Sequence, residues 1–211
     1  MIKTLLPVFC ILFLFAGCSK DDDDSDNGNN NAPGLGFEVT THDETKACQG
    51  TTFFVYKYCD PDIIYEVDMD GEVVWKLELS ETLGSAQSEA ELLSGDSILL
   101  VSQGVGIYIL NRDGDILWQH DDPKVSHDAD MLSSGNILYV YGMGDAKGDT
   151  IVKEITMSGT RVWHWDPSQY FDYSPYSEID PVSGQGWAHA NSVTRLDNGN
   201  TLISIRNFNM I

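Results

Sequence analysis

Four polar side chains on two short segments have the residue types of a ligand-binding site. His127 opens the segment "HDADMLSSGNILYVYG", and His189 opens "HANSVTRLDNGNTLISIRN", which also carries Asn191 and Arg206. Imidazole, amide and guanidinium groups all donate hydrogen bonds, and the guanidinium presents its donors in a fixed geometry. If the fold brings the two segments together, both histidines would face one small ligand.

The spacing of the two histidines suggests that they belong together. His127 lies eight residues before Gly135, and His189 lies ten residues before Gly199, so two consecutive repeats begin with a histidine at a similar place. Where repeats close around a central channel, their equivalent positions converge on one end of that channel. The alternative for each histidine is a partly buried side chain whose hydrogen bonds are satisfied within the fold.

Asn191 and Arg206 flank the strand that follows His189. Asn191 lies two residues after His189, so an extended backbone would place both side chains on one face. Arg206 directly follows the apolar run "LISI". An arginine at this place in so acidic a chain requires a partner, which is either an anionic ligand or a nearby aspartate.

Two sequence elements alternate along the chain and indicate a repeat. One is a glycine followed by an apolar strand, at Gly50, Gly95, Gly135 and Gly199. The other is a turn glycine followed four residues later by tryptophan, in the pairs Gly71 and Trp75, Gly114 and Trp118, Gly159 and Trp163. The turn glycines are 43 and 45 residues apart.

This repeat predicts an all-β fold. Asp-Gly, Asn-Gly and Ser-Gly turns join short strands, and no segment has a helical period. A period near 45 residues with about four strands and a recurring tryptophan is typical of a β-propeller blade. We expect the tryptophans to pack between blades.

Residues 37–211 form the predicted partial propeller domain. They hold about three blades and the start of a fourth, whereas propellers have four to eight. We therefore expect a truncated chain, and poor stability for an open array of blades. Residues 166–186, "DPSQYFDYSPYSEIDPVSGQG", lengthen the last interval and predict a long surface loop.

The N-terminus predicts a lipoprotein. Residues 1–17 have the charged and apolar regions of a signal peptide, and "LFAGC" resembles a lipobox that would place lipid on Cys18. Residues 18–36 are an acidic, Asn-rich tether that resembles the surface-export signal of Bacteroidetes-type lipoproteins. We expect an outer-membrane lipoprotein at the cell surface. The alternatives are a periplasmic tether and an ordinary secretory signal.

Charge and cysteine content limit the partners. The chain has 12 Lys and Arg against 33 Asp and Glu, a formal charge of -21, which argues against nucleic acid and against docking on anionic lipid. Membrane contact would be made only through the lipid at Cys18. Cys48 and Cys59 could pair in an oxidising compartment, but an extended strand between them would hold them too far apart unless it bends.

Three segments resemble the bacterial arylsulfotransferase family that does not use PAPS. They are "GTTFFVYKYCDPDIIYEVDMDGEVVWKLEL", "VSHDADMLSSGNILYVYG" and "WAHANSVTRLDNGNTLISIRN". The resemblance covers most of residues 50–209. It implies a six-bladed propeller that transfers a sulfuryl group from an aryl sulfate to a phenol through a sulfo-histidine, without a cofactor. It also implies that His127, His189, Asn191 and Arg206 belong to the catalytic anion-binding site.

The chain departs from the family pattern at the nucleophile. The family's nucleophilic histidine lies C-terminal to the arginine, and none of the five histidines here matches that place. We therefore expect this fragment alone to be inactive, with the nucleophile in a missing C-terminal part. The alternatives are a non-catalytic surface propeller that binds sulfated or aromatic ligands, and a scaffold that contacts a partner through residues 166–186.

Overall fold

The computed structural model describes residues 39–40, 43, 45–57, 61–80, 83, 87–142, 144–180 and 186–211. The predicted signal peptide, the lipidation site Cys18, the tether and Cys59 lie outside these residues. Cys48 is exposed, and its pairing with Cys59 therefore stays a prediction. Among the described residues, no helix has the length and apolar character needed to cross a membrane.

The described residues form an all-β structure, as the repeat predicts. Its strands are β1 (Thr52–Tyr56), β2 (Ile63–Val67), β3 (Val73–Glu78), β4 (Gln87–Leu92), β5 (Ile98–Ser102), β6 (Gly106–Leu110), β7 (Ile116–Asp121), β8 (Val125–Met131), β9 (Ile137–Tyr141), β10 (Val152–Ile155), β11 (Arg161–Trp165), β12 (Ala190–Arg195) and β13 (Thr201–Ile205). Two short helices, α1 (Ser168–Phe171) and η2 (Tyr176–Glu178), lie in the predicted surface loop.

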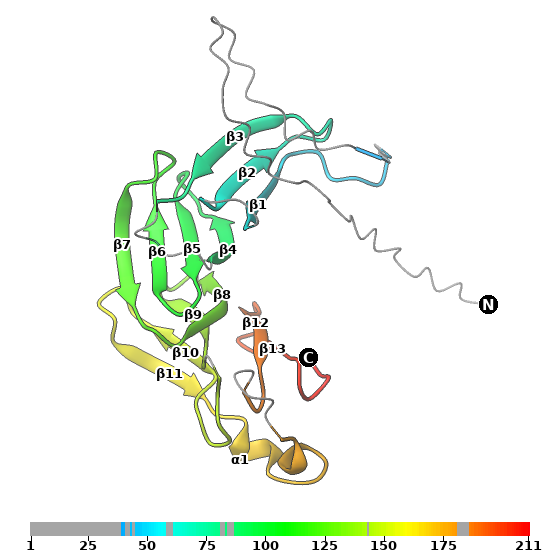
Figure 1. The fold of residues 1–211 in the computed structure, drawn as a ribbon, viewed down its shortest axis with the longest axis vertical. Coiled ribbons are helices and arrows are strands. Elements are labelled where there is room, and N and C mark those ends of the chain that lie inside the picture. Colours follow the sequence, from blue (N-terminus) through cyan, green and yellow to red (C-terminus); the bar gives the residue numbers. More distant parts are fainter. Residues whose placement is uncertain are drawn as a thin grey trace, which may run out of the picture.

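The strands form four antiparallel sheets in chain order. The first sheet holds β1–β3, the second β4–β7, the third β8–β11 and the fourth β12–β13. Within each sheet, strands that are consecutive in the sequence pair with one another, which is the pattern that tight glycine turns produce. The sheets follow one another along an open arc in Figure 1.

The first strands of three sheets form an inner row on the concave side of the arc. Strand β4 lies against β8, and β8 lies against β12. Strands β1, β5 and β9 each contact the first strand of the next sheet, in the pairs β1 with β4, β5 with β8, and β9 with β12 (Figure 1). By its place after Gly50, β1 is equivalent to β5 and β9, the second strands of their sheets. The inner row (β4, β8 and β12) therefore brings together segments that are far apart in the sequence.

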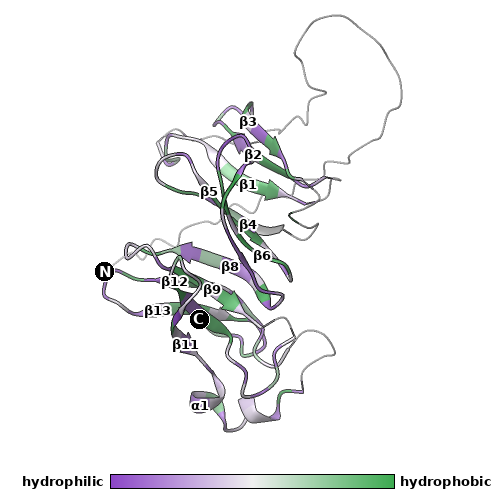
Figure 2. Cartoon of the chain, turned by 90° about the vertical axis from the view of Figure 1, so that its left-hand side faces the viewer, coloured by the Kyte–Doolittle hydropathy of each residue, from purple (hydrophilic) through white to green (hydrophobic). Residues whose placement is uncertain are grey.

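A separate hydrophobic core lies between each pair of neighbouring sheets. Between the second and third sheets, Leu99 and Val101 of β5 pack in one cluster with Ile137 and Tyr139 of β9. All five residues of β5 and all five of β6 are buried. Figure 2 shows the contrast between apolar β6 and β9 and the more hydrophilic β8 of the inner row.

The recurring tryptophans pack between sheets, as predicted. The guanidinium carbon of Arg112, from the second sheet, lies 4.5 Å from the ring centroid of Trp75 in the first, and Arg112 also pairs with Glu66 at 2.7 Å. Trp118 of the second sheet donates its Nε1 proton to the carbonyl of Met157 in the third at 2.8 Å. Each of these tryptophans therefore joins its sheet to the next one.

The third tryptophan repeats the arrangement of the first. Arg195 of the fourth sheet lies 5.0 Å from the ring of Trp163 in the third, and it pairs with Glu154 at 2.9 Å. Trp163 and Glu154 are cross-strand partners, as are the tryptophan and glutamate of the first sheet. The same stacked cation and ion pair thus recur at two sheet interfaces.

We predict that removing a buried side chain of the second sheet destabilises the fold strongly. Leu100 is fully buried, so Leu100→Ala should lower the free energy of unfolding by about 2–5 kcal/mol through lost burial and a residual cavity. Leu117→Ala is the matched control, because Leu117 is 60% exposed; it should change stability by less than about 0.5 kcal/mol. Equal urea-unfolding midpoints for the two variants would contradict the assigned core.

Candidate functional site

Each strand of the inner row has a β-bulge near the same end. The register shifts lie between Gln87 and Glu89 in β4, between Val125 and Ala129 in β8, and between Ala190 and Ser192 in β12. A bulge leaves extra residues unpaired and re-aims their side chains, and bulges are frequent beside functional sites. His127 lies within the bulge of β8, and Asn191 is the extra residue of β12.

The structure brings His127 and His189 into direct contact. Their Nε2 atoms are 3.2 Å apart, and their ring centroids are 5.2 Å apart with planes inclined by 35°. Both side chains are partly buried. At this distance one ring nitrogen carries the proton and the other accepts it, so the two rings share one hydrogen bond.

The two histidines meet from different positions of the repeat. The residue pair nearest the turn is Met131 with Ile137 in the third sheet and Arg195 with Thr201 in the fourth. His127 lies four residues before Met131, and the residue four before Arg195 is Asn191, not His189. His189 lies one residue before β12 begins. The prediction that the two histidines occupy similar places in their repeats is therefore wrong in detail. Their rings meet because β8 and β12 are neighbours.

His127 is held towards its neutral form. Burial lowers the pKa of its imidazole, and the positive charges of His189, Lys57 and Arg206 lower it further. The adjacent carboxylate of Asp128 acts in the opposite direction. A neutral imidazole can donate from one nitrogen and accept at the other.

The backbone of His189 is strained and held from two sides. Its φ is +53°, a left-handed conformation that a residue with a side chain adopts only when its surroundings impose it. Its amide donates to Oδ1 of Asp145 at 3.3 Å, and its carbonyl accepts the amide proton of Arg206 at 3.0 Å. These contacts hold the backbone segment that carries the imidazole.

Asp145 is a site residue that the sequence analysis missed. It is 3% exposed, and its Oδ2 accepts the amide proton of Ala188 at 2.8 Å. Its own carbonyl accepts the amide proton of Trp187 at 2.7 Å. Burial raises the pKa of this carboxyl, while the amides of Ala188 and His189 oppose that shift. No short-range pattern in "GMGDAKGD" indicates this long-range contact.

Gly186 allows Asp145 to approach the chain closely. Its φ is +78°, and a Cβ atom at this position would overlap the carboxylate of Asp145 and lie 2.8 Å from its backbone nitrogen. Only glycine fits such a contact without displacing the neighbour. The close contact between Gly186 and Asp145 therefore determines the backbone path from Gly186 to His189.

Arg206 and Asn191 lie beside the histidine pair with exposed side chains. The main chain of Arg206 is bonded to His189, whereas its guanidinium forms no salt bridge within the described part of the chain. The expected extended path from His189 to Asn191 is wrong, because the left-handed φ of His189 and the β12 bulge interrupt it. The positive charge of Arg206 nevertheless lowers the pKa of His127.

A pair of carboxyl groups, Asp128 and Glu89, lies within the inner row next to His127 in the chain fold. Asp128 is buried, and its Oδ2 accepts the amide proton of Val193 at 2.6 Å. The carboxyl of Glu89 is hydrogen-bonded to Asp128 and accepts the amide proton of Ala129 at 3.3 Å. Burial, the hydrogen bond to Asp128 and its charge raise the pKa of Glu89 to about 9. This pair connects all three strands of the inner row.

The remaining histidines of the described chain lie on the outer strands. His120 stacks with Trp118 on β7, and His164 is exposed on β11. His42 lies outside the described residues. Within the described part of the chain, no group of three or more His, Cys, Asp or Glu side chains could hold a metal ion.

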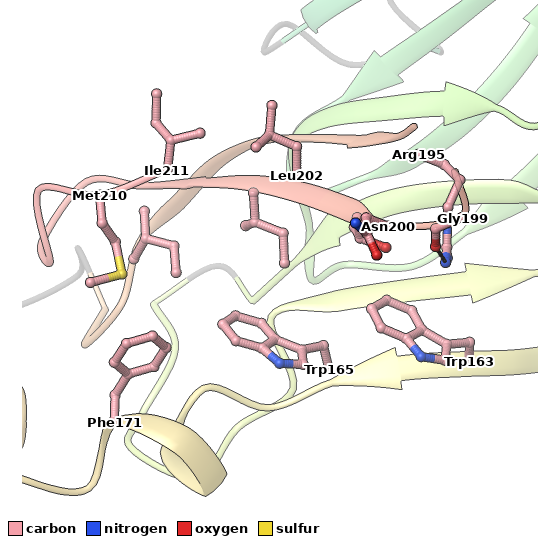
Figure 3. A pocket seen from close by; sticks show the side chains of 12 residues that line it. Trp163, Trp165, Phe171, Arg195, Gly199, Asn200, Leu202, Met210 and Ile211 are labelled. Atoms are coloured by element: carbon pink, nitrogen blue, oxygen red, sulfur yellow. Dashed lines mark hydrogen bonds between the residues drawn. The ribbon is translucent and has the colours of Figure 1, made fainter. Parts of the chain in front are cut away.

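A groove with mixed polar and apolar lining lies apart from the histidine pair, between β11 and β13 (Figure 3). Its volume is about 530 Å³. Trp163, Trp165 and Phe171 line one side, and Leu202 and Met210 line the other. None of the four predicted site residues lines it.

Comparison with known proteins associates the chain with one family. Residues 38–211 match the model of the Arylsulfotransferase (ASST) family. None of the curated proteins is similar enough to the chain to match it.

Solved structures also resemble the chain. One is a protein of unknown function from Bacteroides caccae, with 19% identity and a TM-score of 0.48 over 74% of this chain and 50% of that one. Another is BamB from Moraxella catarrhalis, with 19% identity and a TM-score of 0.35 over 55% of this chain and 34% of that one. The chain thus spans half the length of the first protein and about a third of the second.

We predict that Gly186→Ala disrupts the His189 segment. The added methyl group collides with Asp145, so stability should fall by about 2–4 kcal/mol and the ring signals of His189 should shift in NMR spectra. Gly199→Ala is the control, because it has a similar φ of +84° but nothing within 4 Å of its Cβ position. It should cost about 1 kcal/mol and leave His189 unchanged. Equal effects of the two variants would refute the close contact.

We also predict that Glu89 makes stability depend on pH. Its pKa rises from 4.5 to about 9 on folding, so the folded protein keeps a proton that the unfolded chain releases, and stability falls as pH rises through this window. Glu89→Gln removes this titration and should stabilise the protein more at pH 8 than at pH 5. The control is Glu72→Gln on an exposed turn. Urea unfolding at both pH values measures the difference, and an equal gain at the two would contradict the prediction.

Proposed function

Given that the chain belongs to the arylsulfotransferase family, we propose that His127, His189, Asn191 and Arg206 bind the sulfuryl group of an aryl sulfate, which is transferred to a phenol. The observation that carries this proposal is the histidine pair at 3.2 Å, with the backbone of Arg206 bonded to His189. These contacts gather four hydrogen-bond donors of the predicted site at one end of the inner row.

The chemistry of sulfuryl transfer suits these groups. We infer that the moving SO3 group spreads charge over its equatorial oxygens, as a transferring phosphoryl group does, so catalysis depends on positioning and charge stabilisation. Arg206 offers two N–H donors to two oxygens, and Asn191 offers an amide. One imidazole of the pair protonates the departing phenolate oxygen.

The covalent step requires a nucleophile other than these residues. In the proposed route a histidine attacks sulfur, the sulfur–oxygen bond to the aryl group breaks, and the phenol acceptor then takes the SO3 group from the histidine. His127 and His189 are bonded to each other, and His120 and His164 lie on outer strands. We propose that the nucleophile is a histidine in a part of the family domain outside these residues.

We propose that the four sheets are blades of a β-propeller, which has six blades by the family pattern. The inner row supports this arrangement, because the first strands of neighbouring sheets lie side by side. In that geometry the bulged ends of β4, β8 and β12 surround the mouth of a central channel. We further propose a lipid anchor at Cys18 and a location on the outer membrane, at the cell surface.

A binding protein without turnover is the second candidate. The mutual hydrogen bond of His127 and His189 favours it, because this bond occupies the Nε2 atom of each ring. Such a protein would hold sulfated or aromatic ligands with the same donors. Binding of p-nitrophenyl sulfate without release of nitrophenol from the complete protein would favour this candidate.

We predict that Arg206→Ala removes most of the transfer from p-nitrophenyl sulfate to phenol. It should also weaken binding of p-nitrophenyl sulfate about tenfold, the loss expected for a charge-assisted hydrogen bond. Arg161→Ala is the matched control, because Arg161 is exposed on the outer strand β11. Isothermal titration and nitrophenol release provide the two measurements. An Arg206→Ala variant that matches wild type in both would refute the proposed site.

A further inference from the structure

Lys57 occupies in the first sheet the position that Arg206 occupies in the fourth. Strands β1 and β13 are both second strands of the repeat, five residues long, and each begins two residues after a glycine, Gly50 and Gly199. Lys57 and Arg206 each follow that glycine by seven residues. The repeat therefore carries a cation at the same place twice.

This position lies at the end of the inner row that carries the histidine pair. The last residue of each second strand pairs with the first residue of the neighbouring first strand, in the pairs Ser102 with Gln87, Tyr141 with Val125, and Ile205 with Ala190. The residue after a second strand is thus beside a bulge. Strand β1 lies against β4, and β4 lies against β8, which carries His127.

The charge of Lys57 acts on His127. Lys57 and Arg206 both lower the pKa of His127, and Lys57 has the larger effect of the two. Both side chains are exposed, and neither forms a salt bridge within the described part of the chain. Six of the other described cations do form them: Lys46, Lys76, Arg112, Lys147, Lys153 and Arg195.

We propose that Lys57 is a second cation of the anion site and binds the sulfate group of the ligand from the side of β1, while Arg206 binds it from the side of β13. This inference rests on the proposed function of the site. A lysine ammonium is a compact point charge on a flexible stem, so it can follow an oxygen that moves during transfer. Two cations on different sides would compensate the negative charge of a sulfate ester in an otherwise acidic protein.

The first test measures the effect of Lys57 on the pKa of His127 in the absence of ligand. Removing a nearby positive charge favours the protonated imidazole, so Lys57→Gln should raise the pKa of His127 in an NMR titration, and Arg206→Gln should do the same. Lys76→Gln is the control, because Lys76 lies on the outer strand β3 and pairs with Glu78. An unchanged pKa of His127 in the Lys57→Gln variant would overturn the inference.

The second test measures binding of p-nitrophenyl sulfate, with phenol as the uncharged probe. Lys57→Gln should weaken binding of the sulfate ester about tenfold at low salt, leave phenol binding unchanged, and be rescued by Lys57→Arg. If Lys57→Gln binds the ester as wild type does while Arg206→Gln does not, the inference fails and the proposed function stands. If wild type does not bind the ester, both fail.

Discussion

The buried carboxylate of Asp145 holds the strained segment on which the candidate site depends. It accepts the amide protons of Ala188 and His189, and a buried carboxylate is stable only when such donors replace water. The left-handed backbone of His189 directs its ring towards His127, and Gly186 leaves the space that Asp145 requires. Without this contact, the segment before β12 would have no reason to adopt a conformation that L-residues avoid.

The site also shows how an acidic protein can present positive charge. The carboxylates of Asp128 and Asp145, beside the histidine pair, accept the amide protons of Val193, Ala188 and His189. Glu89, with its raised pKa, is protonated at neutral pH. The acidic groups beside the site are thus either bonded to the main chain or uncharged. The exposed cations are therefore left to face a ligand, although the chain as a whole carries a charge of -21.

The scaffold consists of contacts that recur from one repeat to the next, whereas the candidate site depends on features that differ between repeats. The tryptophan contacts with Arg112 and Arg195 are nearly the same at two interfaces, and each sheet core is filled by equivalent strands. The bulges, in contrast, differ in size between β8 and β12. A uniform repeat would place equivalent residues around the inner row, but these differences let His127 and His189 meet from unequal positions.

The elements of the scaffold are predictable from the amino-acid sequence alone. Glycine turns, apolar runs and the spacing of Trp75, Trp118 and Trp163 predicted short antiparallel strands and the packing of tryptophan between sheets, because these features depend on residues close together in the chain. The sequence also singled out His127, His189, Asn191 and Arg206 as candidates. It did so through their types and through the resemblance of the surrounding motifs to the arylsulfotransferase family.

The positions of those candidates relative to one another depend on long-range contacts. The contact of His127 with His189 joins residues 62 apart, the bond of Asp145 to His189 spans 44 residues, and that of Asp128 to Val193 spans 65. Contacts at such separations depend on which strands become neighbours and on where each bulge shifts the register. A single extra residue reverses the face that a side chain occupies, and no local pattern in the sequence records that shift.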